Sequence, residues 1–247
     1  MDELIGLNRT KQLQKLISSY TGKLIRTHFG KGPESIYVSI GEKYVVIYLR
    51  NFISPVEQVL FENGHMDLVY TMREKVMVLI RSELKSYLEK VIGVRPDDFY
   101  EDWCLKSKSA VLVALCSQSI PFAPKANEHY EGKAELEQEL LLMSRNMHKE
   151  PERIYSCEIN PRKLLIVRYG VLTSFEREWI TAFGDEKLKQ MKKKLEKKEI
   201  YQSRRLEAIL SRPLTDVFID WNFSADRCLT LLVLKAKSAR DIEPVRI

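Results

Sequence analysis

The chain has 247 residues, of which 45% are hydrophobic, and it carries 40 Lys and Arg against 34 Asp and Glu. This composition disfavours a disordered chain, a collagen-like repeat and a small disulfide scaffold, and the length favours two small domains. The net charge of +6 permits weak attraction to anionic membrane surfaces or nucleic acid but requires neither.

The first predicted elements are a helix and a β-hairpin. Apolar residues recur at helical spacing from Leu13 to Ile25, which predicts a helix that ends near Gly30. Two strand-like runs follow at 35–40 and 44–49, and the short polar turn between them indicates a hairpin.

Two helices and a second strand pair complete this part of the chain. Ser54 and Glu57 have the spacing of a capping box, in which the hydroxyl accepts a backbone N–H and the carboxylate reaches back to the cap N–H. A short helix therefore begins at Ser54. A longer helix is predicted over 66–92, followed by strands at 99–105 and 110–116.

The same elements then return in the same order, which indicates a tandem duplication. The segment 33–37 (PESIY) recurs at 151–155 (PERIY), and Trp103 recurs as Trp221, a displacement of about 118 residues. The second copy predicts a helix over 136–147, strands at 153–159 and 163–169, a helix over 186–210, and strands at 217–223 and 228–235. Thr173 and Glu176 repeat the capping box. A catalytic role for Glu57 and Glu176 is the alternative, and the spacing favours the capping role over it.

These elements predict an α+β fold. We expect two tandem repeats of an α-β-β-α-α-β-β two-layer sandwich with antiparallel sheets, because hairpins pair neighbouring strands and the helices must bury their apolar faces on a sheet. The expected boundaries are 1–117 for the first repeat, 118–132 for the linker and 133–247 for the second, divergent repeat. We expect the repeats to form an intrachain pseudo-dimer, and further homo-oligomerisation is left open.

One glycine-rich motif is a candidate binding site for an anion or a partner. Gly30, Lys31, Gly32 and Pro33 place two glycines around a lysine, and backbone N–H groups in such a segment can cradle an anion. The alternative, which we favour, is that Gly30 ends the helix in a left-handed conformation and Pro33 begins the strand. The second copy has no glycine at this position.

A basic stretch in the last long helix is the strongest charge feature. Its residues are Lys187, Lys192, Lys193, Lys194, Lys197, Lys198, Arg204 and Arg205. The simplest interpretation is a solvated helix face. The alternatives are a basic surface for an acidic protein, anionic lipid or nucleic acid, although scarce aromatic residues count against single-stranded nucleic acid.

The sequence carries no recognisable catalytic or metal-binding motif. No two histidines have metal-ligand spacing, no nucleophile motif is present, and no run of about 18 apolar residues exists. We therefore expect no cofactor, no metal, no transmembrane segment and no enzymatic activity. The acidic start of the chain lacks a signal peptide, so we expect a cytoplasmic protein whose cysteines are reduced.

The first copy resembles the MpsC family. The resemblance lies in the run from Gly30 to Glu34, the turn with Ser54 and Glu57, the pair Met72 and Arg73, and Gly93 before the last hairpin. It covers about residues 10–117 well and 134–236 more faintly. It implies a soluble component of a cation-translocating system that generates membrane potential, whose membrane partners are also linked to inorganic-carbon uptake.

These observations predict a non-enzymatic accessory or regulatory protein. The expected partner is a protein, such as a subunit of a membrane complex. We expect the chain to bind it as a peripheral protein at the inner face of the membrane. The alternative is a nucleic-acid-binding protein that uses the basic helix, and a third hypothesis is an enzyme or anion sensor at Gly30 to Pro33.

Overall fold

A computed structural model describes residues 2–236 of the chain. These residues divide into two compact units between Lys125 and Ala126, within the expected linker. Residues 237–247, which the sequence assigns to the second repeat, lie outside the described residues.

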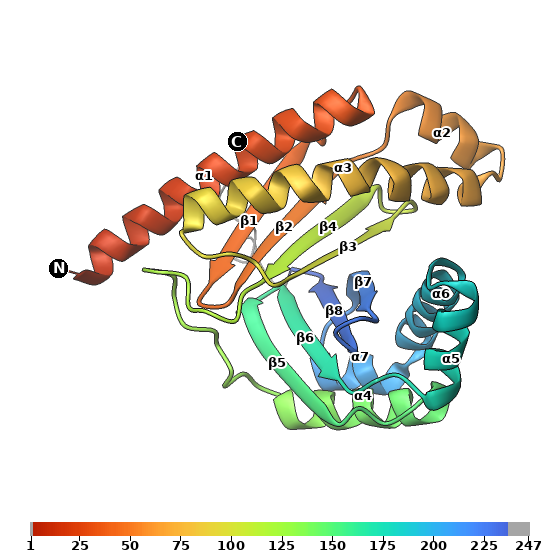
Figure 1. Ribbon diagram of the computed structural model, residues 1–247. Coiled ribbons are helices and arrows are strands. Elements are labelled where there is room, and N and C mark those ends of the chain that lie inside the picture. Colours follow the sequence, from red (N-terminus) through yellow and green to blue (C-terminus); the bar gives the residue numbers. More distant parts are fainter. Residues whose placement is uncertain (1, 237–247) are drawn as a thin grey trace. The chain divides into compact units, whose positions relative to one another are not determined.

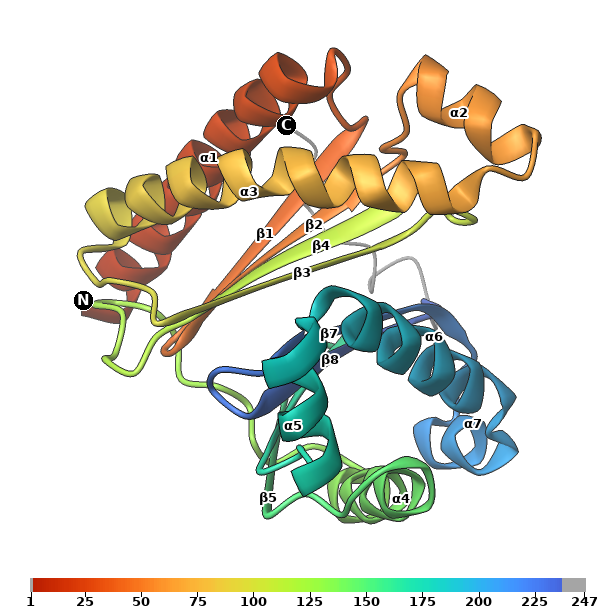
Figure 2. The same ribbon diagram turned by 45° about the vertical axis from the view of Figure 1, so that its right-hand side comes forward.

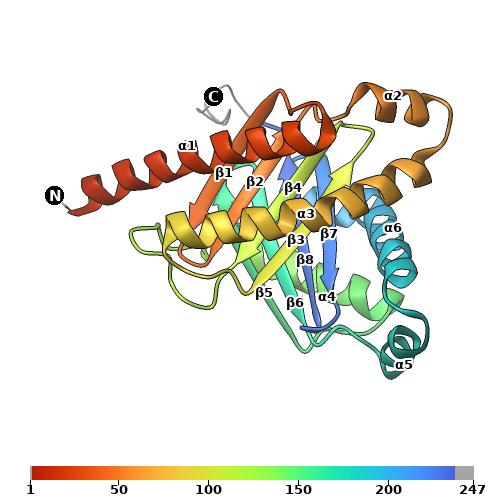
Figure 3. The ribbon, with the colours of Figure 1, turned by 45° about the horizontal axis from the view of Figure 1, so that its top comes forward.

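The first unit is a four-stranded antiparallel sheet with its helices on one face (Figure 1). Its elements are α1 (Asp2–Phe29), β1 (Ser35–Gly41), β2 (Tyr44–Arg50), α2 (Pro55–Glu62), α3 (Met66–Ile92), β3 (Asp98–Cys104) and β4 (Ser109–Leu115), with strand order β1-β2-β4-β3. Helices α1 and α3 lie side by side across the sheet (Figure 3). They bury Ile17, Ile80 and Leu84 completely against it.

The second unit repeats this topology (Figure 2). Its elements are α4 (Lys133–Met147), β5 (Arg153–Asn160), β6 (Lys163–Tyr169), α5 (Ser174–Phe183), α6 (Glu186–Gln202), α7 (Arg204–Leu210), β7 (Leu214–Asn222) and β8 (Arg227–Leu234), with strand order β5-β6-β8-β7. The predicted fold class, tandem α+β repeats with antiparallel sheets, is confirmed.

One predicted helix is wrong, and another is longer than its apolar spacing showed. The first helix begins at Asp2, before the apolar positions that start at Leu13. The helix expected over 186–210 is two helices, because the backbone leaves the helical region at Ser203 (φ −76°, ψ 100°) and its hydroxyl accepts the N–H of Leu206. As a result α7, rather than α6, packs against α4.

Both short helices begin in capping boxes. The Ser54 N–H donates to Glu57 Oε2 at 2.7 Å, and the Glu57 N–H donates to Ser54 Oγ at 3.3 Å. In α5 the Thr173 N–H donates to Glu176 Oε2 at 2.9 Å, and the Glu176 N–H donates to Thr173 Oγ1 at 3.1 Å. Each box fixes one glutamate at the start of a helix, pointing inward.

None of the helices within residues 2–236 combines the length and the apolar character needed to cross a membrane.

Candidate functional site

A buried ion pair lies beneath the start of α2 in the first unit. Arg73 of α3 donates from Nε to Glu57 Oε1 at 2.7 Å and from Nη2 to the Phe52 carbonyl at 2.9 Å. Both charged side chains are 0% exposed. The guanidinium carbon lies 4.5 Å from the ring centroid of Phe52 and 5.8 Å from that of Trp103, within cation–π range. The capping glutamate is therefore also the counter-ion of a fully buried arginine.

The second unit has a lysine in place of this arginine. Lys192 of α6 follows Glu176 at the spacing by which Arg73 follows Glu57, and its ammonium donates to Glu176 Oε1. Lys192 Nζ lies 4.0 Å from the ring centroid of Trp221. A compact ammonium has fewer hydrogen-bond donors than a guanidinium, so it can satisfy fewer acceptors around the buried charge.

Two positions that are apolar in the first unit carry charge in the second. Arg168 stands opposite Cys228 in the sheet, as Leu49 stands opposite Ala110. Glu196 follows Lys192 by one helical turn, as Met77 follows Arg73. Arg168 Nη2 donates to Glu196 Oε2 at 2.5 Å, and both side chains are at most 3% exposed. The second unit therefore has a further buried ion pair at positions where the first unit has the apolar residues Leu49 and Met77.

Small polar side chains complete the surroundings of Arg168. Its Nη1 donates to Ser144 Oγ at 2.7 Å, and its Nη2 donates to Thr230 Oγ1 at 3.2 Å and to Cys228 Sγ at 3.0 Å. Burial raises the pKa of the Cys228 thiol well above its ordinary value, although the Arg168 charge opposes this, so the thiol is protonated.

His148, at the end of α4, lies between the two carboxylates. Its Nδ1 is 4.0 Å from Glu176 Oε1, and its Nε2 is 3.6 Å from Glu196 Oε1. Burial lowers the pKa of His148, and the Lys192 and Arg168 charges lower it further against the two glutamates, so the imidazole is neutral at pH 7. We call His148, Arg168, Glu176, Lys192 and Glu196 the polar cluster.

The polar cluster contains buried atoms with no hydrogen-bond partner in the structure. They are His148 Nε2, Arg168 Nε and Glu196 Oε1. Glu176 is better satisfied: burial raises its pKa, but the Lys192 ammonium and the Thr173 hydrogen bonds outweigh this and hold the pKa below its usual range. Native structures seldom leave buried polar atoms unpaired, and such atoms often lie at functional sites.

A cavity of about 660 Å³ lies beside the polar cluster, between the end of α4, the start of α5 and α6. Its polar wall is formed by His148, Thr173, Glu176 and Lys192. Its apolar wall is formed by Met147, Phe175, Leu188, Met191 and Leu195, and two further lysines, Lys194 and Lys198, line it as well. This volume falls in the range of small-molecule sites, and the mixed lining is typical of them.

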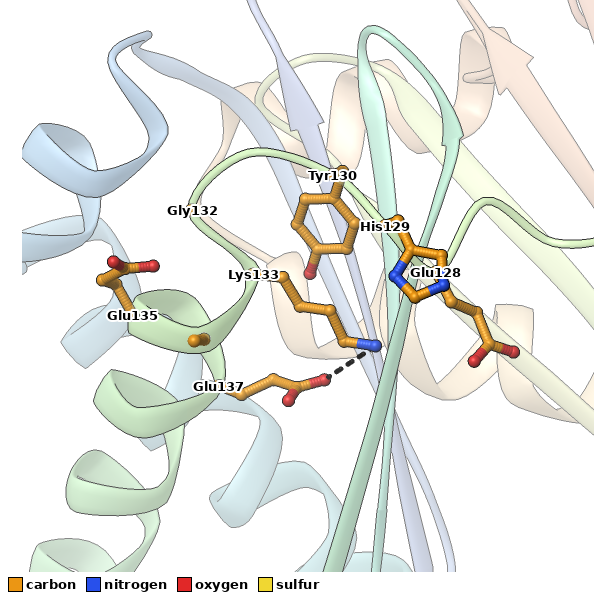
Figure 4. A pocket seen from close by; sticks show the side chains of 8 residues that line it. Glu128, His129, Tyr130, Gly132, Lys133, Glu135 and Glu137 are labelled. Atoms are coloured by element: carbon orange, nitrogen blue, oxygen red, sulfur yellow. Dashed lines mark ion pairs between the residues drawn. The ribbon is translucent and has the colours of Figure 1, made fainter.

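A second cavity, of about 530 Å³, lies where the chain enters α4 (Figure 4). Lys133 Nζ lies 3.8 Å from Glu137 Oε1 there. Ser156 Oγ donates to Glu137 at 2.6 Å and shares a hydrogen bond of 2.7 Å with the Tyr130 hydroxyl. These polar groups are already paired with one another, so we treat them as structural.

The structure places the glycine-rich motif at a helix end. Gly30 has φ of +72°, and its N–H donates to the Arg26 carbonyl at 3.0 Å, as expected for a residue that ends α1. Lys31 is exposed, and Gly32 lies so close to Arg26 that a Cβ would be 3.3 Å from Nη2. Anion binding at this segment stays a prediction.

The expected basic surface is smaller than its sequence suggests. Lys187, Lys194, Lys198, Arg204 and Arg205 are exposed. Lys193 lies 2.8 Å from Asp220, and with Lys189 it overcomes the effect of burial and lowers the Asp220 pKa to about 2. Lys197 is half-buried. The placement of Lys192 on this surface is wrong: it is 2% exposed, because its position on α6 faces the sheet.

Sequence reasoning missed His148, Arg168 and Glu196. A usable signal was present, since Arg168 interrupts the apolar strand KLLIVRY and Glu196 falls one turn after Lys192 on the sheet-facing side of its helix. Charged residues at core positions are rare unless they are paired.

The polar cluster can hold and orient charge, but it is not arranged as a metal site. Over residues 2–236, no group of three or more His, Cys, Asp or Glu side chains could hold a metal ion. The cluster therefore offers buried cations and carboxylates beside a cavity, with one neutral imidazole between them.

Comparison with known proteins agrees with the repeat. No curated protein and no solved structure matches the chain. The family model described as "Na+-translocating membrane potential-generating system (MpsC)" matches residues 9–118 and again 132–236. The chain therefore belongs to the MpsC family and carries the family's domain twice.

Proposed function

We propose that the protein is a non-enzymatic accessory or regulatory component of the membrane-potential-generating system that the family description names. The observation that carries this proposal is the family match over both copies. In this proposal the protein acts from the cytoplasmic side and contacts a protein subunit of that system.

An exposed aromatic surface on α5 supports a partner-binding role. Phe175, Trp179 and Phe183 lie at successive helical turns and are 71%, 37% and 74% exposed. Their rings contact one another, with centroids 6.1 and 4.9 Å apart. We call these three residues the α5 aromatic surface. Contiguous exposed apolar side chains often mark sites of association.

The α5 aromatic surface belongs to the second copy alone. The residue that corresponds to Phe175 in the first unit is Val56, and the one that corresponds to Phe183 is Gly64. Because the rings are specific to the divergent copy, we place the partner contact there.

Recovery of bound proteins from native membranes tests the proposal. We expect the wild-type chain to recover an ion-transport or inorganic-carbon-transport component, and Phe175→Asp with Phe183→Asp to recover much less. Val56→Asp is the matched control, because Val56 is 66% exposed at the corresponding position of α2. If the wild type recovers no such component, the proposed function is wrong. If Val56→Asp reduces recovery and the variant with Phe175→Asp and Phe183→Asp does not, the α5 aromatic surface is not the binding site.

Nucleic-acid binding is the alternative, and the burial of Lys192 and the pairing of Lys193 with Asp220 weaken it. Binding of DNA and RNA at two salt concentrations tests it. Binding through phosphates must weaken steeply as salt rises, and affinity that shows this dependence and falls in Lys194→Ala with Lys198→Ala would favour the alternative.

A further inference from the structure

One residue that lines the cavity replaces an aromatic residue that covers the buried arginine of the first unit. In the first unit Arg73 is covered by the rings of Phe29 and Phe52 and is 0% exposed. The corresponding residues in the second unit are His148 and Val171, which are smaller. Of these two residues, His148 lines the cavity of the second unit.

Folding alone does not require the charges of Arg168 and Glu196. The first unit builds the same sheet and helix order with Leu49 and Met77 where the second has Arg168 and Glu196. A buried ion pair loses solvation that a hydrophobic pair does not, and apolar replacements are often equally stable or more so. Arg168 and Glu196 do not line the cavity themselves, but Glu196 lies 3.6 Å from His148, which does, so the pair supports part of the cavity wall.

The lining of the cavity defines the class of ligand. Lys192, Lys194 and Lys198 bring three positive charges, and Glu176 brings one negative charge. Since Lys192 is already paired with Glu176, the exposed Lys194 and Lys198 remain to attract an anion. Met191 and Leu195 share the wall with them and favour an apolar group beside that anion.

His148 also lines the wall of the cavity. Its Nδ1 lies 4.0 Å from Glu176 Oε1 and its Nε2 lies 3.6 Å from Glu196 Oε1, so both ring nitrogens face carboxylates of the polar cluster. We therefore assign the contact with an anion to the exposed lysines and not to His148.

We propose that the cavity of the second unit binds a small amphipathic anion, a molecule with one phosphate or carboxylate group attached to an apolar chain or ring. Lys194 and Lys198 contact the anionic group, and Met191 and Leu195 contact the apolar part. Such a ligand has two sources, a free amphiphile or an anionic lipid in a membrane. The proposal does not rest on the protein partner proposed above, although Phe175 lines the cavity and also belongs to the α5 aromatic surface.

Calorimetric titration with decyl phosphate, below the concentration at which it forms micelles, tests the site on the full chain. We expect one molecule of decyl phosphate to bind per chain. The affinities for inorganic phosphate and for decanol should each be lower by a factor of about ten or more, because each compound supplies only half of the contacts. Absence of decyl phosphate binding, or equal binding of inorganic phosphate, would overturn the proposal.

Variants separate the cavity from general attraction to a basic protein. Lys194→Ala with Lys198→Ala, and separately Leu195→Asp, should weaken decyl phosphate binding about tenfold or more. Lys187→Ala with Arg204→Ala removes the same charge from exposed positions that do not line the cavity and should leave binding within about twofold. Since all these residues are exposed, thermal unfolding should confirm folded variants. Equal weakening by both lysine and control variants would contradict a defined site.

Vesicles identify the source of the ligand. If the lipid form is bound, vesicles with about 30% phosphatidylglycerol should sediment the protein and compete with decyl phosphate, whereas phosphatidylcholine vesicles should not. If the free form is bound, neither vesicle should compete. If neutral vesicles compete with decyl phosphate as strongly as anionic vesicles do, the anionic group does not contribute to binding.

Discussion

Arg73 and Glu57 of the first unit are both fully buried, and each is the other's counter-ion. Removing one partner leaves the other charge desolvated and unpaired. We expect Arg73→Met to lower the free energy of unfolding by about 3–5 kcal/mol, measured by urea denaturation. The matched control is Arg177→Met, which breaks a pair whose arginine is 52% exposed and should cost less than about 1 kcal/mol. Equal losses in the two variants would show that burial of the Arg73 pair does not matter.

His148 should make stability depend on pH. Its pKa in the folded protein is below 6.5 because of burial and the nearby Lys192 and Arg168 charges, so the unfolded chain binds its proton more readily. Its contribution to stability is therefore complete above pH 6.5 and is lost as pH falls through the folded-state pKa. Glu176 has a lowered pKa too, but its contribution is lost only below its ordinary value of 4.5.

His148→Phe places the residue of the first copy at this position and should reduce this loss. Urea denaturation at about pH 7.5 and about pH 5.5 would measure the free energy of unfolding at each pH. This free energy should fall more in the wild type than in the variant as the pH is lowered. An unchanged difference would mean that another group causes the pH dependence.

The ends of the long helical segments differ between the copies at one backbone position. Gly93 ends α3 with φ of +74°, and Ser211 ends α7 at the corresponding position with φ of +51°. A left-handed backbone strains a residue that has a Cβ. We expect Ser211→Gly to raise the free energy of unfolding by about 1 kcal/mol and Gly93→Ser to lower it by a similar amount. A loss of stability in Ser211→Gly would contradict this account.

The helix contacts also changed chemistry between the copies. Tyr20 of α1 stacks on Tyr87 of α3, with ring centroids 3.7 Å apart. At the corresponding positions Glu139 of α4 pairs with Arg205 of α7 at 3.0 Å. Part of the basic stretch thus holds α7 against α4, which is a structural role.

The sequence predicted the elements well because they depend on local patterns. The capping box at Ser54 and Glu57 and the repeated strand pairs each rest on residues close in sequence. The break at Ser203 escaped prediction, because serine is tolerated inside helices and its capping role appears only when the backbone turns there. The polar cluster escaped because Arg168 and Glu196 are 28 residues apart and only the folded chain brings their side chains together.

At the scale of the whole molecule, the two copies have separate hydrophobic cores. A change buried in one core should therefore act on its own unit. We expect Glu57→Gln to speed amide hydrogen exchange in β1 to β4 and to leave β5 to β8 unchanged, as measured by mass spectrometry. Equal acceleration in both sheets would show that the units unfold together.

The division of roles between the copies is the broader consequence. The first unit has Leu49 and Met77 beside the buried pair of Arg73 and Glu57, while the second has the charged Arg168 and Glu196 at those positions, a cavity beside them and the α5 aromatic surface. The two copies thus share one fold and differ in the chemistry of the corresponding region.

The stability of a back-substituted second unit tests this account most directly. Arg168→Leu with Glu196→Met restores at both positions the residues of the first copy, Leu49 and Met77. If the charges serve binding rather than folding, the free energy of unfolding should be unchanged or higher by about 1–4 kcal/mol. A loss of about 3–5 kcal/mol, comparable to breaking a buried pair by removing one partner, would contradict the account and make the polar cluster part of what holds the second unit together.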